Sequence, residues 1–230
     1  PLEHIRENLL ALKRGGRLSR VKMLLLTNST FDGVVYNTER VMEQVLAIKP
    51  DIVFLWDEAW WAFARFSYVL RQRTAMRTAE KLARKYRTPE YRAEYEAHIK
   101  SLRPGEEPRL PDPDKVRIRV YATQSTHKTL TSFRQGSMIH IWDEDFTKKS
   151  ETNFHEAYMI HTSTSANYQI LASMDVGRRQ VEFEAYELVE KAIEMGLLLR
   201  RTIRTNERLR KWFDIITIGE LVPGEYRQSG

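Results

Sequence analysis

The sequence contains no cysteine, which excludes disulfide bonds and metal sites built on thiolates. It has no apolar run approaching the roughly 20 residues that a membrane-spanning helix needs. Its start does not resemble a signal peptide. These absences favour a cytoplasmic protein. The first residue is Pro1 rather than an initiator Met, so we expect the chain to be a segment of a longer protein.

Two further kinds of site lack a complete motif. Gly15-Gly16 precedes an apolar run, whereas the glycine-rich loops that bind nucleotide phosphates follow a strand. The zinc-protease pattern that begins at His155-Glu156 has Met159 where a second His is required. His140 and the acidic run 143–145 offer ligands for a hard cation, but an acidic solvated turn accounts for them better. We therefore predict no metal site.

The positive charge is concentrated in one segment. The formal net charge is +6, and residues 71–103 hold ten Lys or Arg against four Glu, an excess equal to that of the whole chain. Tyr86, Tyr91 and Tyr95 alternate with arginines there, as in some proteins that bind nucleic acid. Because charges of both signs surround the predicted helices, solvated helices explain the segment better. We predict a peripheral element that modifies assembly or access to a pocket.

The N-terminal part has the pattern of a helix followed by a strand-helix-strand unit. Residues 2–13 are amphipathic and end at a glycine pair, which predicts a helix. The run 21–28 predicts a buried strand, Asn37 is a helix cap, and the run 51–56 predicts a second strand. A strand, a helix and a strand in this order predict a right-handed crossover and a parallel sheet.

The rest of the chain adds helices and two more strands. The full chain of 230 residues is 42% hydrophobic, which is enough for a real core. Its predicted elements are helices over 71–103, a proline-rich loop over 103–115, strands over 116–124 and 137–142, a helix opened by a capping box from Asn153 to Glu156, and helices from Ser165 almost to Leu221. The predicted fold class is α/β, with a mainly parallel sheet flanked by helices.

Polar residues cluster where the first three predicted strands end. They are the stretches "TNSTFDG", "DEAW" and "STHK". Ligands of open parallel sheets bind beyond the carboxyl ends of the strands. This topology therefore predicts that Asp57 and Lys128 lie on the same rim, although 71 positions separate them.

Pyridoxal phosphate would use each of these groups. Its aldehyde needs a lysine amine for a Schiff base, and its ring nitrogen needs a carboxylate that keeps it protonated; Lys128 and Asp57 suit these roles. Its phosphate needs hydroxyl groups and a nearby proton donor, which Ser125 and His127 supply. Judged alone, Asp57 is more often a helix cap and Lys128 an exposed lysine.

Two residues beside the carboxylate suit the same cofactor. Ala59 is small enough for a flat ring to lie against the backbone, and Trp60 would form a wall of the pocket. We predict both as cofactor-binding residues.

Four stretches in a fixed order carry a resemblance to a known family. They are "LTNSTFDGVVYN", "WDEAWW", "TQSTHKTLTSFRQGSMIH" and "YMIHTSTSANYQILASMDV". Together they resemble the bacterial ornithine/lysine/arginine decarboxylases, which are fold-type I pyridoxal-phosphate enzymes. The resemblance runs from about Leu24 to Val176, interrupted by the basic segment, and implies part of the large cofactor domain of such an enzyme.

The resemblance also implies a role for individual residues. It makes Lys128 the Schiff-base lysine and Asp57 the partner of the pyridine nitrogen, and places Ser125 and His127 at the phosphate. We predict Lys128, His127 and Asp57 as catalytic residues. A hydroxyl of the "HTSTS" stretch contacts the phosphate of the neighbouring subunit in this family, which implies Ser163; capping of the next helix is the alternative.

The sequence also departs from the family pattern. Arg134 and Gly136 stand where relatives often have Ser or Ala, and Phe31 stands where Tyr is frequent. These changes leave the catalytic groups in place. The family's upstream phosphate-binding loop, its ring-stacking His and its smaller C-terminal domain have no counterpart in this chain, which we expect to be the middle and latter part of a cofactor domain.

The domains and function follow as predictions. We expect residues 1–70 and 104–180 to form part of the cofactor domain, 71–103 to be a basic helical insertion, and 181–230 to lead towards a C-terminal domain. The predicted function is decarboxylation of lysine, arginine or ornithine by a homodimer or larger homo-oligomer. Alternatives are another fold-type I activity, such as an aminotransferase or aldolase, a non-catalytic scaffold and, lower, a nucleic-acid-binding protein.

Overall fold

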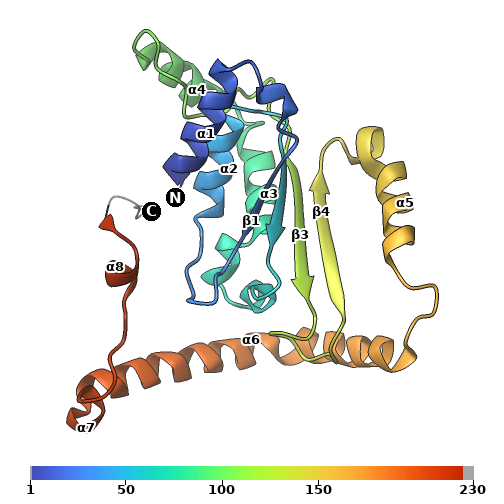
Figure 1. Cartoon of the computed structure of the whole chain (residues 1–230), viewed down its shortest axis with the longest axis vertical. Helices are drawn as coiled ribbons and strands as arrows, with labels where there is room; N and C mark the ends of the chain where they lie inside the picture. The colour runs from blue at the N-terminus through green and yellow to red at the C-terminus, as the bar shows by residue number, and fades with distance from the viewer. Residues whose placement is uncertain (1, 225–230) are drawn as a thin grey trace.

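One four-stranded sheet forms the centre of the structure, a computed structural model that describes residues 2–224. The strand order is β1-β2-β3-β4, with β1, β2 and β3 parallel and β4 antiparallel to β3 (Figure 1). The strands are β1 Met23–Thr27, β2 Val53–Asp57, β3 Arg119–Ser125 and β4 Ser137–Asp143. The prediction of an α/β fold with a mainly parallel sheet is confirmed.

Helices and short helical turns make up most of the remaining chain. The α-helices are α1 Leu2–Arg14, α2 Thr38–Leu46, α3 Ala75–Lys85, α4 Pro89–Ser101, α5 Glu151–His161, α6 Tyr168–Thr205, α7 Glu207–Arg210 and α8 Ile218–Leu221. The 3₁₀ turns are η1 Leu18–Arg20, η2 Ala62–Phe66 and η3 Leu70–Arg73, and η4 Phe146–Ser150 is a π-helical turn. The Asn37 side chain accepts from Arg40 N and so caps α2, as predicted.

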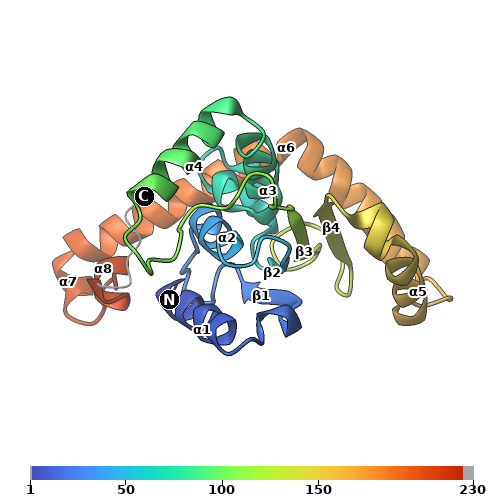
Figure 2. The ribbon, with the colours of Figure 1, turned by 90° about the horizontal axis from the view of Figure 1, so that it is seen from above.

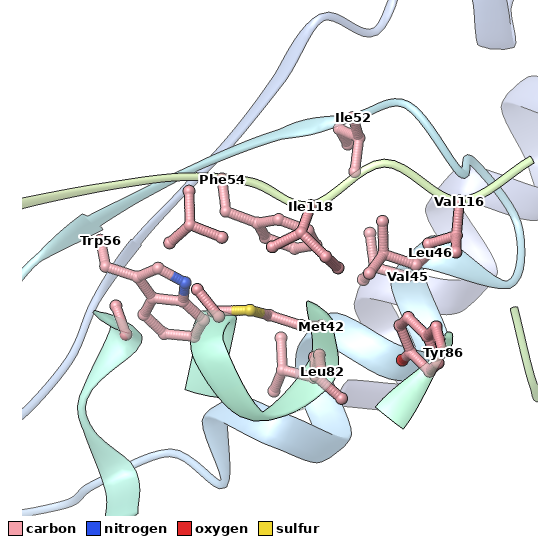
Figure 3. Close-up of a cluster of buried hydrophobic side chains, with 14 of the residues drawn as sticks. Met42, Val45, Leu46, Ile52, Phe54, Trp56, Leu82, Tyr86, Val116 and Ile118 are labelled. Carbon is pink, nitrogen blue, oxygen red and sulfur yellow. The ribbon is translucent and has the colours of Figure 1, made fainter. Parts of the chain in front are cut away.

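The hydrophobic core lies between one face of the sheet and the helices α1, α2 and α3, which lie together on that side in the view from above (Figure 2). Side chains alternate along β2, so Phe54 and Trp56 are buried in this core. Figure 3 shows them facing Met42 and Val45 of α2 and Leu82 of α3. Two helices therefore pack on the inner face of β2.

The prediction that residues 71–103 form a peripheral element is wrong for α3. Ala75, Ala79 and Leu82 are fully buried in the core, because small residues at helical spacing let α3 pack closely on the sheet. The basic side chains lie on the opposite face, where Lys81 pairs with Glu39 of α2. The high charge of α3 lies on its solvated face. The sequence prediction did not identify the apolar face of this helix.

The first strand differs from its prediction as well. β1 is shorter than the run 21–28 and lies at an edge of the sheet, and Met23 and Leu25 are 49% and 60% exposed. Their side chains share the sheet face that faces away from α2 and α3, because successive residues of a strand alternate between faces. The prediction of a buried strand is therefore wrong on this face.

The C-terminal half supports the end of the sheet at which the parallel strands finish. α6 passes below that end in Figure 1, where the Tyr186 ring meets Phe66 of η2 at 5.8 Å. Ser173 Oγ accepts from Phe133 N at 3.0 Å, in the loop that follows β3. The long helix α6 thus holds the β3–β4 loop from below.

Two predicted helix starts in this half are wrong by a few residues. α5 begins at Glu151, so Asn153 lies inside the helix and caps nothing; the π-helical turn η4 leads directly into it. Asn167 caps α6 by accepting from Ile170 N, rather than a residue of the "HTSTS" stretch.

A buried ion pair joins the first residue of β3 to the last of β4. Arg119 donates to both carboxylate oxygens of Asp143 at 2.8 and 3.0 Å, and the Tyr121 hydroxyl donates to the same carboxylate at 2.7 Å. Burial alone would raise the pKa of Asp143, but the bonds from Arg119 and Tyr121 hold the pKa below its ordinary value. The pair closes the antiparallel edge of the sheet.

We expect Asp143→Asn to lower the free energy of unfolding by roughly 3 kcal/mol, because it leaves the buried Arg119 without its charged partner. The depressed pKa means that this stabilisation is present above the unfolded pKa of about 3.9 and is lost as the pH falls through the lower folded value. Urea unfolding from pH 7 to pH 3 measures both effects. Asp175→Asn, in an exposed pair with Arg178, is the control and should change stability little; equal losses would contradict the prediction.

Candidate active site

The carboxyl ends of β1, β2 and β3 lie side by side, and one further backbone hydrogen bond continues each of the two strand pairs. Asn28 N donates to Asp57 O at 2.8 Å, and Glu58 N donates to Thr123 O at 2.9 Å. The three polar stretches seen in the sequence therefore start from neighbouring points on one rim. Their side chains can reach the same ligand.

Asp57 is held at the end of β2 by its own turn. Its Oδ1 accepts from Ala59 N at 3.0 Å, which is the local turn that aspartate favours. Within the described part of the chain, no other group bonds to this half-buried carboxylate. One oxygen thus fixes the side chain, and the other is available to a ligand.

Lys128, Trp60 and Phe31 form a small cluster that joins all three strand ends. Lys128 Nζ lies 5.5 Å from the centre of the Trp60 ring, and that ring meets Phe31 edge-on with a centroid distance of 5.3 Å. Phe31 is 87% and Trp60 42% exposed, and Lys128 is exposed too. The amine is accessible to solvent and lies over an aromatic face, which attracts its positive charge.

The loop between β3 and β4 fixes the remaining polar groups. Ser125 ends β3 and is 8% exposed. The Gly136 carbonyl accepts from both Thr126 N and His127 Nδ1, each at 3.1 Å. Because a carbonyl only accepts, Nδ1 of His127 carries hydrogen, which leaves Nε2 for a ligand.

Two residues in these loops have an unusual backbone conformation. Ser29, after β1, and Gln135, before β4, have φ of 70° and 75°, and no other non-glycine residue in 2–224 has a positive φ. Such conformations cost energy and concentrate at functional sites. Both lie in the loops that border the candidate site.

Sequence reasoning missed Glu58, which is fully buried beside Asp57. Asn28, Ala75 and Gln124 each donate a hydrogen bond to its carboxylate, and burial raises its pKa despite these bonds. A signal was present in the sequence. The alternation that buries Phe54 and Trp56 places Glu58 on the same inner face, where a carboxylate needs partners.

The structure does not bring Ser163 to the other predicted residues. It is exposed between α5 and α6, and that connection lies on the far side of β4 from β2 (Figure 1). Its hydroxyl bonds locally, donating to Ser165 O at 3.2 Å and accepting from Ser165 N at 3.1 Å. Within this chain, Ser163 therefore lies apart from the candidate site.

The acidic run considered for a cation is occupied by ion pairs. Asp143 pairs with Arg119, Glu144 with Arg87 and Asp145 with Lys149. Within 2–224, no three His, Asp or Glu side chains gather as a metal site would need. Much of the basic segment is paired likewise, as with Lys85 and Glu43. These pairs reduce the charge available to nucleic acid.

Comparison with known proteins decides the family. The family model described as "Orn/Lys/Arg decarboxylase, major domain" matches residues 3–86 and 96–223. The chain belongs to the Orn/Lys/Arg decarboxylase family. Residues 87–95, at the start of α4, fall outside the match, whereas α3 falls inside it.

Named members of this family are similar in sequence and in structure. Lysine decarboxylase LdcA of Pseudomonas aeruginosa is 34% identical over 205 residues, which are 87% of this chain and 23% of that protein. The biodegradative arginine decarboxylase of Escherichia coli is 27% identical over 194 residues, covering 82% and 21%. The solved structure of lysine decarboxylase A from P. aeruginosa superposes with a TM-score of 0.56 at 32% identity, covering 86% and 22%.

The chain spans about a fifth of the length of these decarboxylases. The match lies in the major domain, as the family description states. Within residues 2–224, no helix is both long and apolar enough to cross a membrane.

Proposed function

We propose that the protein containing this chain is a pyridoxal-phosphate-dependent decarboxylase of a basic amino acid. The observation that carries the proposal is the convergence of an accessible amine, Lys128, with a carboxylate, Asp57, at the ends of adjacent parallel strands. Membership of the Orn/Lys/Arg decarboxylase family supports it.

The residues present fit pyridoxal phosphate. Lys128 offers a solvent-accessible amine for covalent attachment, and Asp57 keeps an oxygen for the ring nitrogen. The Ser125 hydroxyl and His127 Nε2 are donors for the phosphate; His127 donates from Nε2 in its cationic form, since Nδ1 is engaged by Gly136. We assign Ala59 and Trp60 to the ring, because Ala59 N bonds to Asp57 and the Trp60 ring lies 5.5 Å from Lys128 Nζ.

When bound, the cofactor supplies a protonated ring that accepts the electrons of the bond to the leaving carboxyl group. The negative charge of Asp57 holds the proton on the ring nitrogen and so maintains that capacity. Lys128 would hold the cofactor and would be a base near the reacting carbon. His127 is the second group near the reacting carbon that can carry a proton.

Lysine, arginine and ornithine are the proposed substrates, in keeping with the description of the family. We also propose a homodimer or larger homo-oligomer, in which Ser163 reaches the phosphate bound by the neighbouring subunit. Its exposure and its place on the far side of β4 from the other groups support this assignment. A cytoplasmic location accords with the absence of cysteine.

Product analysis of the full-length protein tests the proposal. Each basic amino acid is incubated with the protein and pyridoxal phosphate, and carbon dioxide, amines and keto acids are measured. Release of carbon dioxide with equimolar diamine, or agmatine from arginine, is the expected result. A keto acid would indicate an aminotransferase, and an unchanged substrate with every amino acid would favour a non-catalytic scaffold.

A further inference from the structure

The buried carboxylate of Glu58 links three elements at the rim of the sheet. Its Oε1 accepts from Asn28 Nδ2 at 3.0 Å and from Ala75 N at 2.7 Å. Its Oε2 accepts from Gln124 Nε2 at 3.0 Å. The side chain is fully buried, so these bonds replace the water that a carboxylate otherwise binds.

Two of the three donors to Glu58 lie next to groups of the candidate site, and the third begins helix α3. Asn28 is the first residue after β1, and its backbone N–H donates to Asp57 O. Gln124 immediately precedes Ser125 in β3. Ala75 is the first residue of α3, where the helix dipole favours a negative charge.

The sheet itself holds the rim only as far as its last backbone bonds. Those are Asn28 N to Asp57 O at 2.8 Å and Glu58 N to Thr123 O at 2.9 Å. Beyond them the chain segments diverge into loops. Past that point, hydrogen bonds to the Glu58 side chain tie β1 and β3 to β2.

We propose that Glu58 is a positioning residue of the cofactor site: it holds the ends of β1 and β3 against β2 so that Asp57 and the 125–128 stretch face one ligand. This inference rests on the proposed function. Glu58 itself touches neither the cofactor nor the substrate; it acts through Asn28 and Gln124.

The test uses the full-length protein and two substitutions at Glu58. Glu58→Met keeps the side chain's length and removes all three acceptor bonds, so we expect pyridoxal phosphate to bind at least about tenfold more weakly. Glu58→Gln retains Oε1 for Asn28 and Ala75, and Gln124 can turn its amide to accept from the new NH₂ group. We expect this conservative variant to recover most of the lost affinity.

Controls separate positioning from general stability. Val116→Ala removes methyl groups from the same core three residues before β3 begins, and should lower the unfolding temperature without weakening cofactor binding. Gln124→Met removes only the bond between Glu58 and β3, so it should fold even if Glu58→Met does not. We expect it to bind pyridoxal phosphate about threefold more weakly than the wild type. Unchanged cofactor affinity in Glu58→Met would overturn the proposal. If that variant does not fold, unchanged affinity in Gln124→Met would do so. So would equal weakening in Val116→Ala.

Hydrogen exchange without cofactor keeps this test distinct from that of the proposed function. Both Glu58→Met and its substitute Gln124→Met should speed amide exchange in residues 120–132. Glu58→Met should also speed exchange in residues 24–30. Exchange in α1 and α2 should keep wild-type rates. Uniformly faster exchange would contradict positioning even if the cofactor binds. If the wild-type protein binds no pyridoxal phosphate, the proposed function fails, and Glu58 then has no cofactor to position.

Discussion

Lys128→Ala is expected to lower turnover by on the order of 10³-fold or more, because no other residue of the rim offers an amine for covalent attachment of the cofactor. The substitution should leave the fold intact. Lys128 is exposed and its side chain contacts the Trp60 ring at 5.5 Å, an interaction worth about 0.5–1 kcal/mol at an exposed site. The measurement is amine production under saturating cofactor, together with thermal unfolding.

A matched control distinguishes loss of this amine from loss of a positive charge. Lys148→Ala removes another exposed lysine, from η4 on the other side of β4, and should retain wild-type turnover. Turnover of Lys128→Ala within about tenfold of wild type would contradict the assignment of Lys128 as the covalent residue, since loss of such a residue lowers turnover far more.

Asp57→Asn should lower turnover by at least about 100-fold while leaving cofactor binding partly intact. The amide keeps an oxygen for the bond from Ala59 N, so the turn at the end of β2 is preserved. Only the negative charge that holds the proton on the ring nitrogen is lost. The effect should therefore fall on kcat much more than on the affinity for cofactor, and both are measured on the same preparation.

Asp51→Asn, just before the other end of β2, is the control for this substitution. Asp51 pairs with Lys49 at the surface and lies far along the strand from the rim, so its amide should have little effect on turnover. If Asp57→Asn turned over substrate at a near-normal rate, the role of the carboxylate at the ring nitrogen would be wrong, whatever the role of Lys128.

The arrangement of Asp57 and Lys128 could be predicted because it follows from topology. Strand periodicity and a parallel sheet suffice to place the carboxyl ends of these strands on one rim, and the structure adds that β2 and β3 are neighbours. The cap at Asn37 was predictable for a similar reason, since its bond spans three residues. Local patterns determine both features.

The missed features depend on long-range packing. Glu58 is important because Asn28, Ala75 and Gln124, distant in sequence, converge on it, and no local pattern specifies that convergence. The same holds for α3, whose apolar face consists largely of alanine. Alanine is common on solvated helices too, so it does not identify a buried face in the sequence. In the structure, Ala75 and Ala79 are buried in the core.

Borohydride reduction of the full-length protein with pyridoxal phosphate, followed by peptide mass mapping, tests the central claim most directly. Reduction makes the covalent bond between lysine and cofactor permanent, so the modified peptide identifies the residue. We predict a phosphopyridoxyl group on Lys128, and none in Lys128→Ala. A folded wild-type protein that carries no adduct on Lys128 at excess cofactor would contradict the account.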